Sequence, residues 1–184
     1  MSRLVLASRS PQRRAILEQL GVEFSVKVPV VDELESGPPH EVALENAYRK
    51  ASAIAGSVEA PVLGVDTVVA LGARIYGKPR DPDEARATLT ALAGRRHAVI
   101  SGVCLIVDGR ARSAAAHTWV QFRALEAQFV DWYVASGEWR ERAGAYAIQG
   151  RGAALVAAIE GDYLNVVGLP VATLLDLAPD LLDN

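Results

Sequence analysis

The chain contains little cysteine, histidine or lysine, and these shortages exclude several kinds of site. With a single cysteine, Cys104, it has no internal disulfide and no cysteine-based metal cluster. The three histidines, His40, His97 and His117, lie far apart in the sequence and lack the spacing of a metal-binding motif. We therefore expect any bound metal to be held by carboxylates.

Long apolar runs and a basic, aromatic-rich surface are also missing. The longest charge-free apolar run near the middle of the chain, residues 98–107, is shorter than the roughly 20 residues that cross a bilayer. A net charge of −3 and an aromatic content of 6% argue against a groove for nucleic acid. No secretory signal precedes the first strand-like residues. We expect a cytoplasmic protein without membrane or nucleic-acid partners.

Three common signatures of nucleotide and hydrolase chemistry are absent. The chain has no Walker A loop, no dinucleotide-binding glycine motif after a strand, and no Gly-x-Ser-x-Gly nucleophile motif. It does have ample material for a core, because 51% of its residues are hydrophobic. A length of 184 residues favours a single domain spanning 1–184.

The hydrophobic pattern predicts an α/β fold with a mixed sheet. A hairpin turn at Asp108-Gly109-Arg110 would make at least one strand pair antiparallel. Strands are expected at residues 4–6, 24–30, 61–71, 75–76, 97–107, 112–123 and 154–159. Helices are expected at residues 11–20, 40–57, 82–93, 127–136 and from about 171.

The junction between the first strand and the first helix favours an anion. Ser10 is a suitable N-cap and Pro11 suits the first helical position, so free backbone N–H groups begin the helix. Cationic side chains at that end repel the helix dipole, and an anion bound there would offset that repulsion. A phosphate would accept hydrogen bonds from Ser8, Ser10, Arg13 and the helix end. The alternative is an ordinary capped helix with surface arginines.

Two carboxylates form the second group of candidates. Asp66 interrupts an otherwise apolar strand, where burial without a charged partner is costly. Glu33 follows a strand within a local acidic patch. If the two converge, they suit magnesium, which takes one or two carboxylates together with waters and phosphate oxygens. The alternatives are a bulge that exposes Asp66 and a solvated acidic loop around Glu33.

Only three of the 19 basic residues are lysines, namely Lys27, Lys50 and Lys78. A lysine ammonium is a compact partner for phosphate, so Lys50 and Lys78, together with Arg13, suit a polyphosphate. Lys27 is expected in an alternating strand, without such a role. For Lys78, which stands between a glycine and a proline, a solvated turn is the alternative.

Taken in order, these segments resemble the Maf family of nucleoside triphosphate pyrophosphatases. The matching segments are Leu6-Ala7-Ser8-x-Ser10-Pro11-x-Arg13, Glu33, Lys50-Ala51, Gly64-Val65-Asp66-Thr67, Gly77-Lys78-Pro79, residues 143–150 and residues 165–170. The resemblance implies an elongated mixed sheet flanked by helices, with two lobes and a cleft between them. It also implies hydrolysis of a nucleoside triphosphate to the monophosphate and pyrophosphate, with a divalent cation, Mg²⁺ or Mn²⁺. Family members often look dimeric, so a homodimer is one expectation.

The resemblance assigns a role to each matching residue. Asp66 would be the proton acceptor, or would bind the metal that activates water, and Glu33 would help to hold that metal. Ser8, Arg13, Lys50 and Lys78 would bind phosphates, with Ser10 beside them. Asp66, Lys78 and Glu33 form the expected catalytic set.

Base preference is expected from two further positions. Thr67 and Gln149 match the branch of the family that prefers dTTP and UTP, and a glutamine amide suits a uracil-type ring. Gln12 departs from that branch, which often has arginine at this position associated with substrate choice. The alternative function is a nucleotide-sensing regulator with little or no turnover, because the family is also linked by name to inhibition of septum formation.

Overall fold

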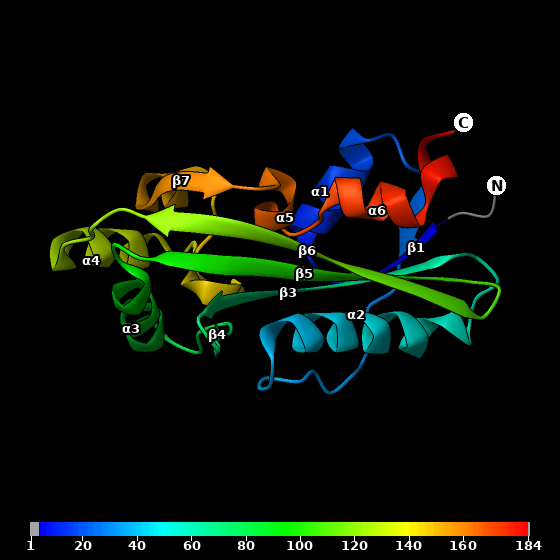
Figure 1. The fold of residues 1–184 in the computed structure, drawn as a ribbon, viewed down its shortest axis with the longest axis horizontal. Coiled ribbons are helices and arrows are strands. Elements are labelled where there is room, and N and C mark those ends of the chain that lie inside the picture. The colour runs from blue at the N-terminus through cyan, green and yellow to red at the C-terminus, as the bar shows by residue number, and fades with distance from the viewer. Residues whose placement is uncertain (1–3, 184) are drawn as a thin grey trace.

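The computed structural model describes residues 4–183 and shows an elongated molecule built on one seven-stranded sheet (Figure 1). The strand order is β2-β1-β3-β5-β6-β7, and β4 pairs with β3. The strands are β1 (Leu4–Ala7), β2 (Phe24–Val26), β3 (Val62–Leu71), β4 (Arg74–Tyr76), β5 (Arg96–Val107), β6 (Arg110–Phe122) and β7 (Val156–Glu160). The helices are α1 (Pro11–Gln19), α2 (Pro39–Ala55), α3 (Pro82–Leu92), α4 (Ala127–Ser136), α5 (Tyr163–Val167) and α6 (Val171–Leu177).

The mixed sheet predicted from the sequence is confirmed. β1 pairs in parallel with β2 and β3, whereas β3, β5, β6 and β7 follow one another antiparallel. Asp108 and Gly109 both have positive φ, 48° and 73°, as a tight hairpin requires. No helix within residues 4–183 has the length and apolar character needed to cross a bilayer.

Two strands begin or end at other residues than the sequence predicts, and one helix was not predicted. β2 ends at Val26 rather than near residue 30, and Pro29 has no N–H to extend the ladder. β7 begins at Val156 rather than Ala154, because a 3-10 turn, Gly150–Leu155, precedes it. The sequence did not predict α5, since five residues are too few for a helical period to show.

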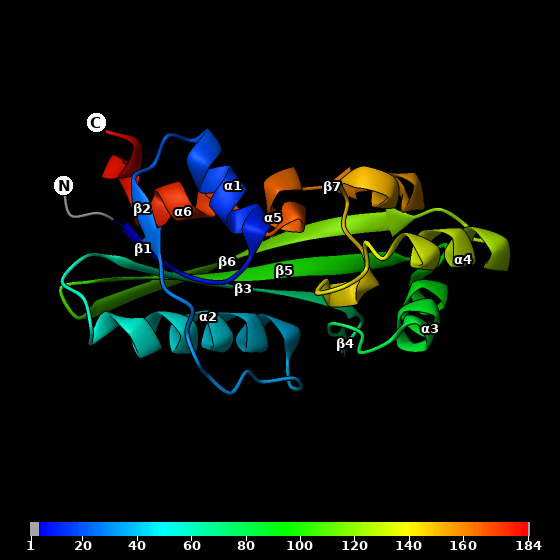
Figure 2. The same ribbon diagram turned by 180° about the vertical axis from the view of Figure 1, so that it is seen from behind.

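Helix α2 lies on one face of the sheet, and α1, α5 and α6 lie on the other (Figures 1 and 2). Two glycines on neighbouring strands let the α2 backbone approach closely. A Cβ at Gly64 would stand 2.2 Å from the carbonyl oxygen of Ala47, and one at Gly102 would stand 2.2 Å from that of Ala43. This close packing brings the side chains of α2 directly onto the middle of β3.

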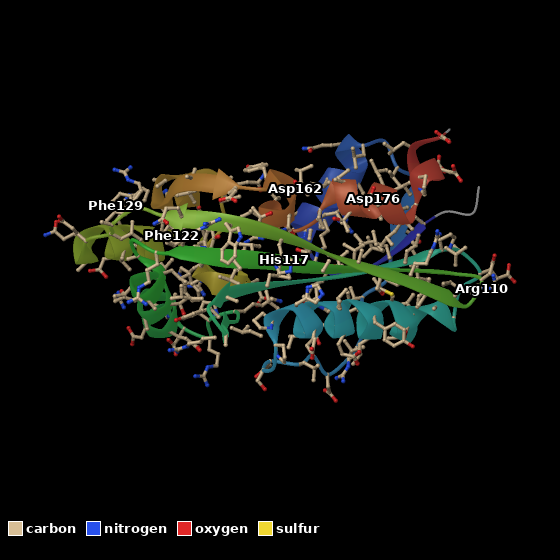
Figure 3. The ribbon with its side chains drawn as sticks, in the orientation of Figure 1. Arg110, His117, Phe122, Phe129, Asp162 and Asp176 are labelled. Carbon is tan, nitrogen blue, oxygen red and sulfur yellow. The ribbon has the colours of Figure 1, made fainter. Side chains whose placement is uncertain are left out.

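Two of the buried core clusters lie toward opposite ends of the sheet. One cluster joins β1, α1 and α6 with the start of β3 and includes Leu6, Leu17, Leu63, Leu169 and Leu174. Another joins α3 and α4 with the end of β3 and includes Val69, Leu89, Leu92, Phe122 and Tyr133. In Figure 3, Arg110 on the β5–β6 hairpin and Phe129 on α4 mark the opposite ends of the molecule.

Strand β3 carries an unpaired stretch of edge between these clusters. Its parallel pairing with β1 ends where Ala7 faces Gly64, and its pairing with β4 starts where Val69 faces Tyr76. Residues 65–68 therefore have a neighbouring strand only on the β5 side. β1 ends at Ala7 and the chain turns there into α1.

A buried histidine packed against Phe122 gives a prediction about acid stability. His97 is fully buried, with Nε2 3.0 Å from the Tyr146 hydroxyl, and burial lowers its pKa from 6.5 to about 4. Below pH 6.5 the unfolded chain takes up a proton that the folded chain does not. The free energy of unfolding therefore decreases as the pH falls from 6.5 towards 4, and the decrease due to His97 reaches about 3 kcal/mol at pH 4.

Urea unfolding at pH 7 and pH 4 tests this expectation in the wild type and in His97→Gln. The variant should lose about 3 kcal/mol less between the two pH values than the wild type does. An equal loss in both proteins would assign the acid sensitivity to other groups.

Candidate functional site

A pocket of about 330 Å³ lies at the open edge of β3. Its walls come from the β1–α1 junction, the loop after β2, α2, the middle of β3 and the segments after β4 and α4. Every site residue predicted from the sequence contributes to it, namely Ser8, Ser10, Gln12, Arg13, Glu33, Lys50, Asp66, Thr67, Lys78 and Gln149. The fold thus brings together residues that are as much as 141 positions apart in the chain, from Ser8 to Gln149.

The β1–α1 junction forms the wall beside the start of α1. The predicted N-cap is confirmed, since the Ser10 hydroxyl accepts the backbone N–H of Arg13. The Ser10 hydroxyl also donates to Gln12 Oε1 at 3.2 Å. The Ser8 hydroxyl accepts the backbone N–H of Ser10 at 3.2 Å. Two hydroxyls and the positive end of a helix dipole therefore meet in one corner of the pocket.

The side chain of Arg13 spans the same corner and is only 9% exposed. Its Nε donates to the carbonyl oxygen of Gly168 at 2.8 Å, Nη1 to Ser8 Oγ at 3.0 Å and Nη2 to Thr67 Oγ1 at 3.2 Å. All three acceptors are neutral. Burial lowers the pKa of Arg13, and the charges of Asp66 and Glu33 act in the opposite direction. The guanidinium is thus oriented without a carboxylate bound to it and keeps its charge for an anion.

Asp66 lies in the middle of β3 and is 6% exposed, so the proposed bulge that would expose it to water is wrong. The Lys50 ammonium lies 2.6 Å from its Oδ1, and Asn46 Nδ2 donates to its Oδ2 at 3.1 Å. Asn46 and Lys50 are four residues apart on α2 and so share one helix face. The buried carboxylate is therefore paired with a cation and hydrogen-bonded on both oxygens.

Glu33 joins this group from the loop after β2. Its Oε1 lies 3.1 Å from Lys50 Nζ, and its side chain is 42% exposed. Lys50, predicted to bind phosphate, thus contacts both candidate carboxylates. Within residues 4–183, no set of three or more His, Cys, Asp and Glu side chains could hold a metal ion. Two carboxylates that share one cation still fit Mg²⁺ or Mn²⁺, since such ions also take water and phosphate oxygens.

Lys78 and Gln149 line the pocket from the segments after β4 and α4. The Lys78 ammonium is 3.5 Å from Glu141, and both side chains are more than half exposed. Such an exposed pair contributes little to stability, so Lys78 is free to exchange Glu141 for a phosphate. Gln149 is exposed and follows Ala147, whose backbone N–H donates to the Tyr133 hydroxyl at 3.1 Å. On β3, the Thr67 hydroxyl lies 2.8 Å from that of Ser101.

Sequence reasoning missed two residues at this site. Asn46 is 2% exposed. The available signal was its position in α2, where a polar residue stands among small apolar ones, four positions before Lys50. Arg142 lines the pocket, and its Nε is buried without a hydrogen-bond partner among the described residues. Burial lowers the pKa of Arg142. Its place directly before the matching segment 143–150 was the signal there.

Comparison with known proteins supports the sequence resemblance. A family model described as Maf-like protein matches residues 3–181. A dTTP/UTP pyrophosphatase of Symbiobacterium thermophilum is 46% identical over 176 residues, which cover 93% of this chain and 90% of the relative. The protein of the same name from Pelotomaculum thermopropionicum is 46% identical over 182 residues, covering 96% of this chain and 95% of the relative.

A more distant relative comes from an archaeon. The dTTP/UTP pyrophosphatase of Pyrococcus furiosus is 41% identical over 182 residues, covering 96% of this chain and 94% of the relative. Among solved structures, the Staphylococcus aureus Ham1 protein aligns with a TM-score of 0.47 and 17% identity, covering 65% of this chain and 71% of that chain. The sequence similarity extends over nearly the whole chain, whereas the structural similarity covers only part of it.

Proposed function

The chain belongs to the Maf-like protein family, and from that premise we propose that it hydrolyses dTTP and UTP to the nucleoside monophosphate and pyrophosphate. The observation that carries the proposal is the single pocket in which Asp66, Lys50 and Glu33 share a wall with Arg13 and the start of α1. The proposal includes a cytoplasmic location, where nucleoside triphosphates are made and used, and a homodimer, as the family resemblance implies.

The cations of the pocket would hold the triphosphate. Arg13 is already oriented by neutral acceptors, and the N-terminus of α1 adds backbone N–H groups and a favourable dipole. Lys78 would reach the phosphates from the segment after β4 by leaving Glu141. Positive groups on both sides of a polyphosphate offset the charge that develops on the leaving pyrophosphate.

Asp66 and Glu33 would supply the hydrolytic chemistry. Asp66 is buried beside the pocket and held on both oxygens, so it can present a carboxylate in a fixed orientation to a water. The same two carboxylates would hold a divalent cation, Mg²⁺ or Mn²⁺. A bound cation would neutralise phosphate charge and lower the pKa of a coordinated water. Lys50 would then exchange a carboxylate contact for a phosphate contact.

Thr67 and Gln149 are the candidates for reading the base. We expect Gln149→Ala to lower kcat/KM for UTP and dTTP by about tenfold, because one hydrogen bond to the base is lost. Hydrolysis of CTP, in which an amino group and a ring acceptor replace the O4 acceptor and N3–H donor of the uracil-type edge, should change by less than about twofold. Steady-state rates of pyrophosphate release from the three nucleotides measure this. An equal loss on all three would assign Gln149 to the phosphates rather than the base.

Product analysis tests the proposed reaction itself. The purified protein, incubated with dTTP or UTP and magnesium, should release pyrophosphate and the monophosphate in equal amounts. Release of orthophosphate and the diphosphate would place the cleavage at a different bond. Tight binding of the nucleotide without any product would favour the nucleotide-sensing regulator. Including ATP, GTP, CTP and modified triphosphates in the panel would show how the Gln12 departure affects base preference.

A further inference from the structure

The side chain of Asn46 contacts both the loop that carries Glu33 and the carboxylate of Asp66. Its Oδ1 accepts the backbone N–H of Leu34 at 2.7 Å, and its Nδ2 donates to the carbonyl oxygen of Leu34 at 3.0 Å and to Asp66 Oδ2 at 3.1 Å. If the Asn46 amide were flipped, its Oδ1 would face the Leu34 carbonyl oxygen and the Asp66 carboxylate, and all three groups are acceptors. The hydrogen-bond partners therefore determine the orientation of the amide. Asn46 is therefore hydrogen-bonded at both ends of its amide.

Side chains of α2 define the position of the loop near Glu33. Residues 27–35 adopt no helix or strand. Three consecutive loop residues are instead each held by one α2 side chain, as Arg49 donates to the carbonyl oxygen of Asp32 at 3.0 Å, Lys50 pairs with Glu33, and Asn46 binds Leu34. The Arg49 contact is exposed and that of Glu33 partly so, whereas Asn46 is 2% exposed. The buried contact is the one that water competes with least.

We propose that Asn46 is a positioning residue that fixes the Glu33 loop against Asp66. The carboxylates of Glu33 and Asp66 are then placed to bind the same cation, which is the Lys50 ammonium in this structure and would be a divalent metal ion in the active protein. This inference rests on the proposed function, because it concerns the same pocket. Glu33 directly precedes Leu34, so holding both backbone polar groups of Leu34 sets where the Glu33 side chain starts. The same amide restricts the rotation of Asp66. A partner that orients metal-binding carboxylates in this way typically changes affinity or activity by 10- to 100-fold when it is lost.

Two substitutions separate the two contacts of Asn46. Asn46→Leu has a similar volume and removes all three hydrogen bonds. Asn46→Asp keeps an acceptor for the Leu34 N–H but loses the donor to the Leu34 carbonyl oxygen and to Asp66, and it places a second negative charge beside Asp66. We expect hydrogen exchange at the Leu34 amide to become at least about tenfold faster in Asn46→Leu and to stay near wild type in Asn46→Asp.

Kinetics on dTTP with varied magnesium provide the second measurement. Both variants should lose about tenfold or more in kcat, and Asn46→Leu should need about tenfold more magnesium for half its maximal rate. Thr118→Val is a matched control, since Thr118 is also fully buried and bonds a loop backbone, at Asp162. It should lower thermal stability without changing either the magnesium requirement or the Leu34 exchange rate.

The outcomes separate this inference from the proposed function. If the wild type does not hydrolyse dTTP, the proposed function fails, and the exchange measurement still reports whether Asn46 holds the loop. Unchanged exchange at Leu34 in Asn46→Leu, or a kcat within about twofold of wild type in that variant, would overturn the positioning role. The same kinetic changes in Thr118→Val would show a general loss of stability instead.

Discussion

Asp66→Asn is expected to lower kcat for pyrophosphate release from dTTP by about 1,000-fold. The substitution keeps the shape of the side chain and removes the negative charge that would take a proton from water or hold a cation. Because Asp66 is buried in the middle of β3 and lines the pocket, no solvent carboxylate can replace it. Steady-state rates at saturating dTTP and magnesium measure the effect. A kcat within about tenfold of wild type would show that Asp66 has neither role.

The fold of this variant needs its own measurement. Lys50 keeps Glu33 as a partner when Asp66 loses its charge, so the ammonium is not left unpaired. We expect a cooperative thermal transition with a lower midpoint, because one partner of a buried ion pair is gone. If Asp66→Asn does not fold, the double variant Asp66→Leu with Lys50→Met replaces the pair by apolar groups. That protein should fold and should be as inactive as the single variant.

Arg13→Lys is expected to lower kcat/KM for dTTP by about 100-fold, although the charge is conserved. The guanidinium donates to Gly168, Ser8 and Thr67 at once, which a single ammonium on a shorter stem cannot do. The loss corresponds to about 2.7 kcal/mol of transition-state stabilisation. Measurements of kcat and KM for dTTP, with the same for UTP, test it.

A neighbouring arginine provides the control for that substitution. Arg14 lies on the same helix, is exposed and does not line the pocket. Arg14→Lys should keep kcat/KM within about twofold of wild type, because surface substitutions seldom matter. If kcat/KM of Arg13→Lys is also within about twofold of wild type, a positive charge suffices at this corner. The several N–H donors of the guanidinium would then have no role in binding.

Much of the fold follows from local patterns in the sequence. The Asp108-Gly109 turn, the Ser10 cap and the alternation of apolar segments predicted most elements within a few residues. Local signals failed where an element was too short, as in α5, or where a proline prevents further pairing, as after β2.

The residue types and their order along the chain determined which side chains were candidates for the site. A carboxylate within an apolar strand, and basic residues beside the start of a helix, can be identified from the sequence alone. Tertiary structure alone decided how they are paired. The end of the β1 ladder at Gly64 opens the edge of β3, and the glycines at 64 and 102 bring α2 onto that edge. As a result Lys50 lies between Asp66 and Glu33, and Asn46 joins the loop to the strand. These pairings depend on strand register and helix approach, which long-range packing sets and no local pattern encodes.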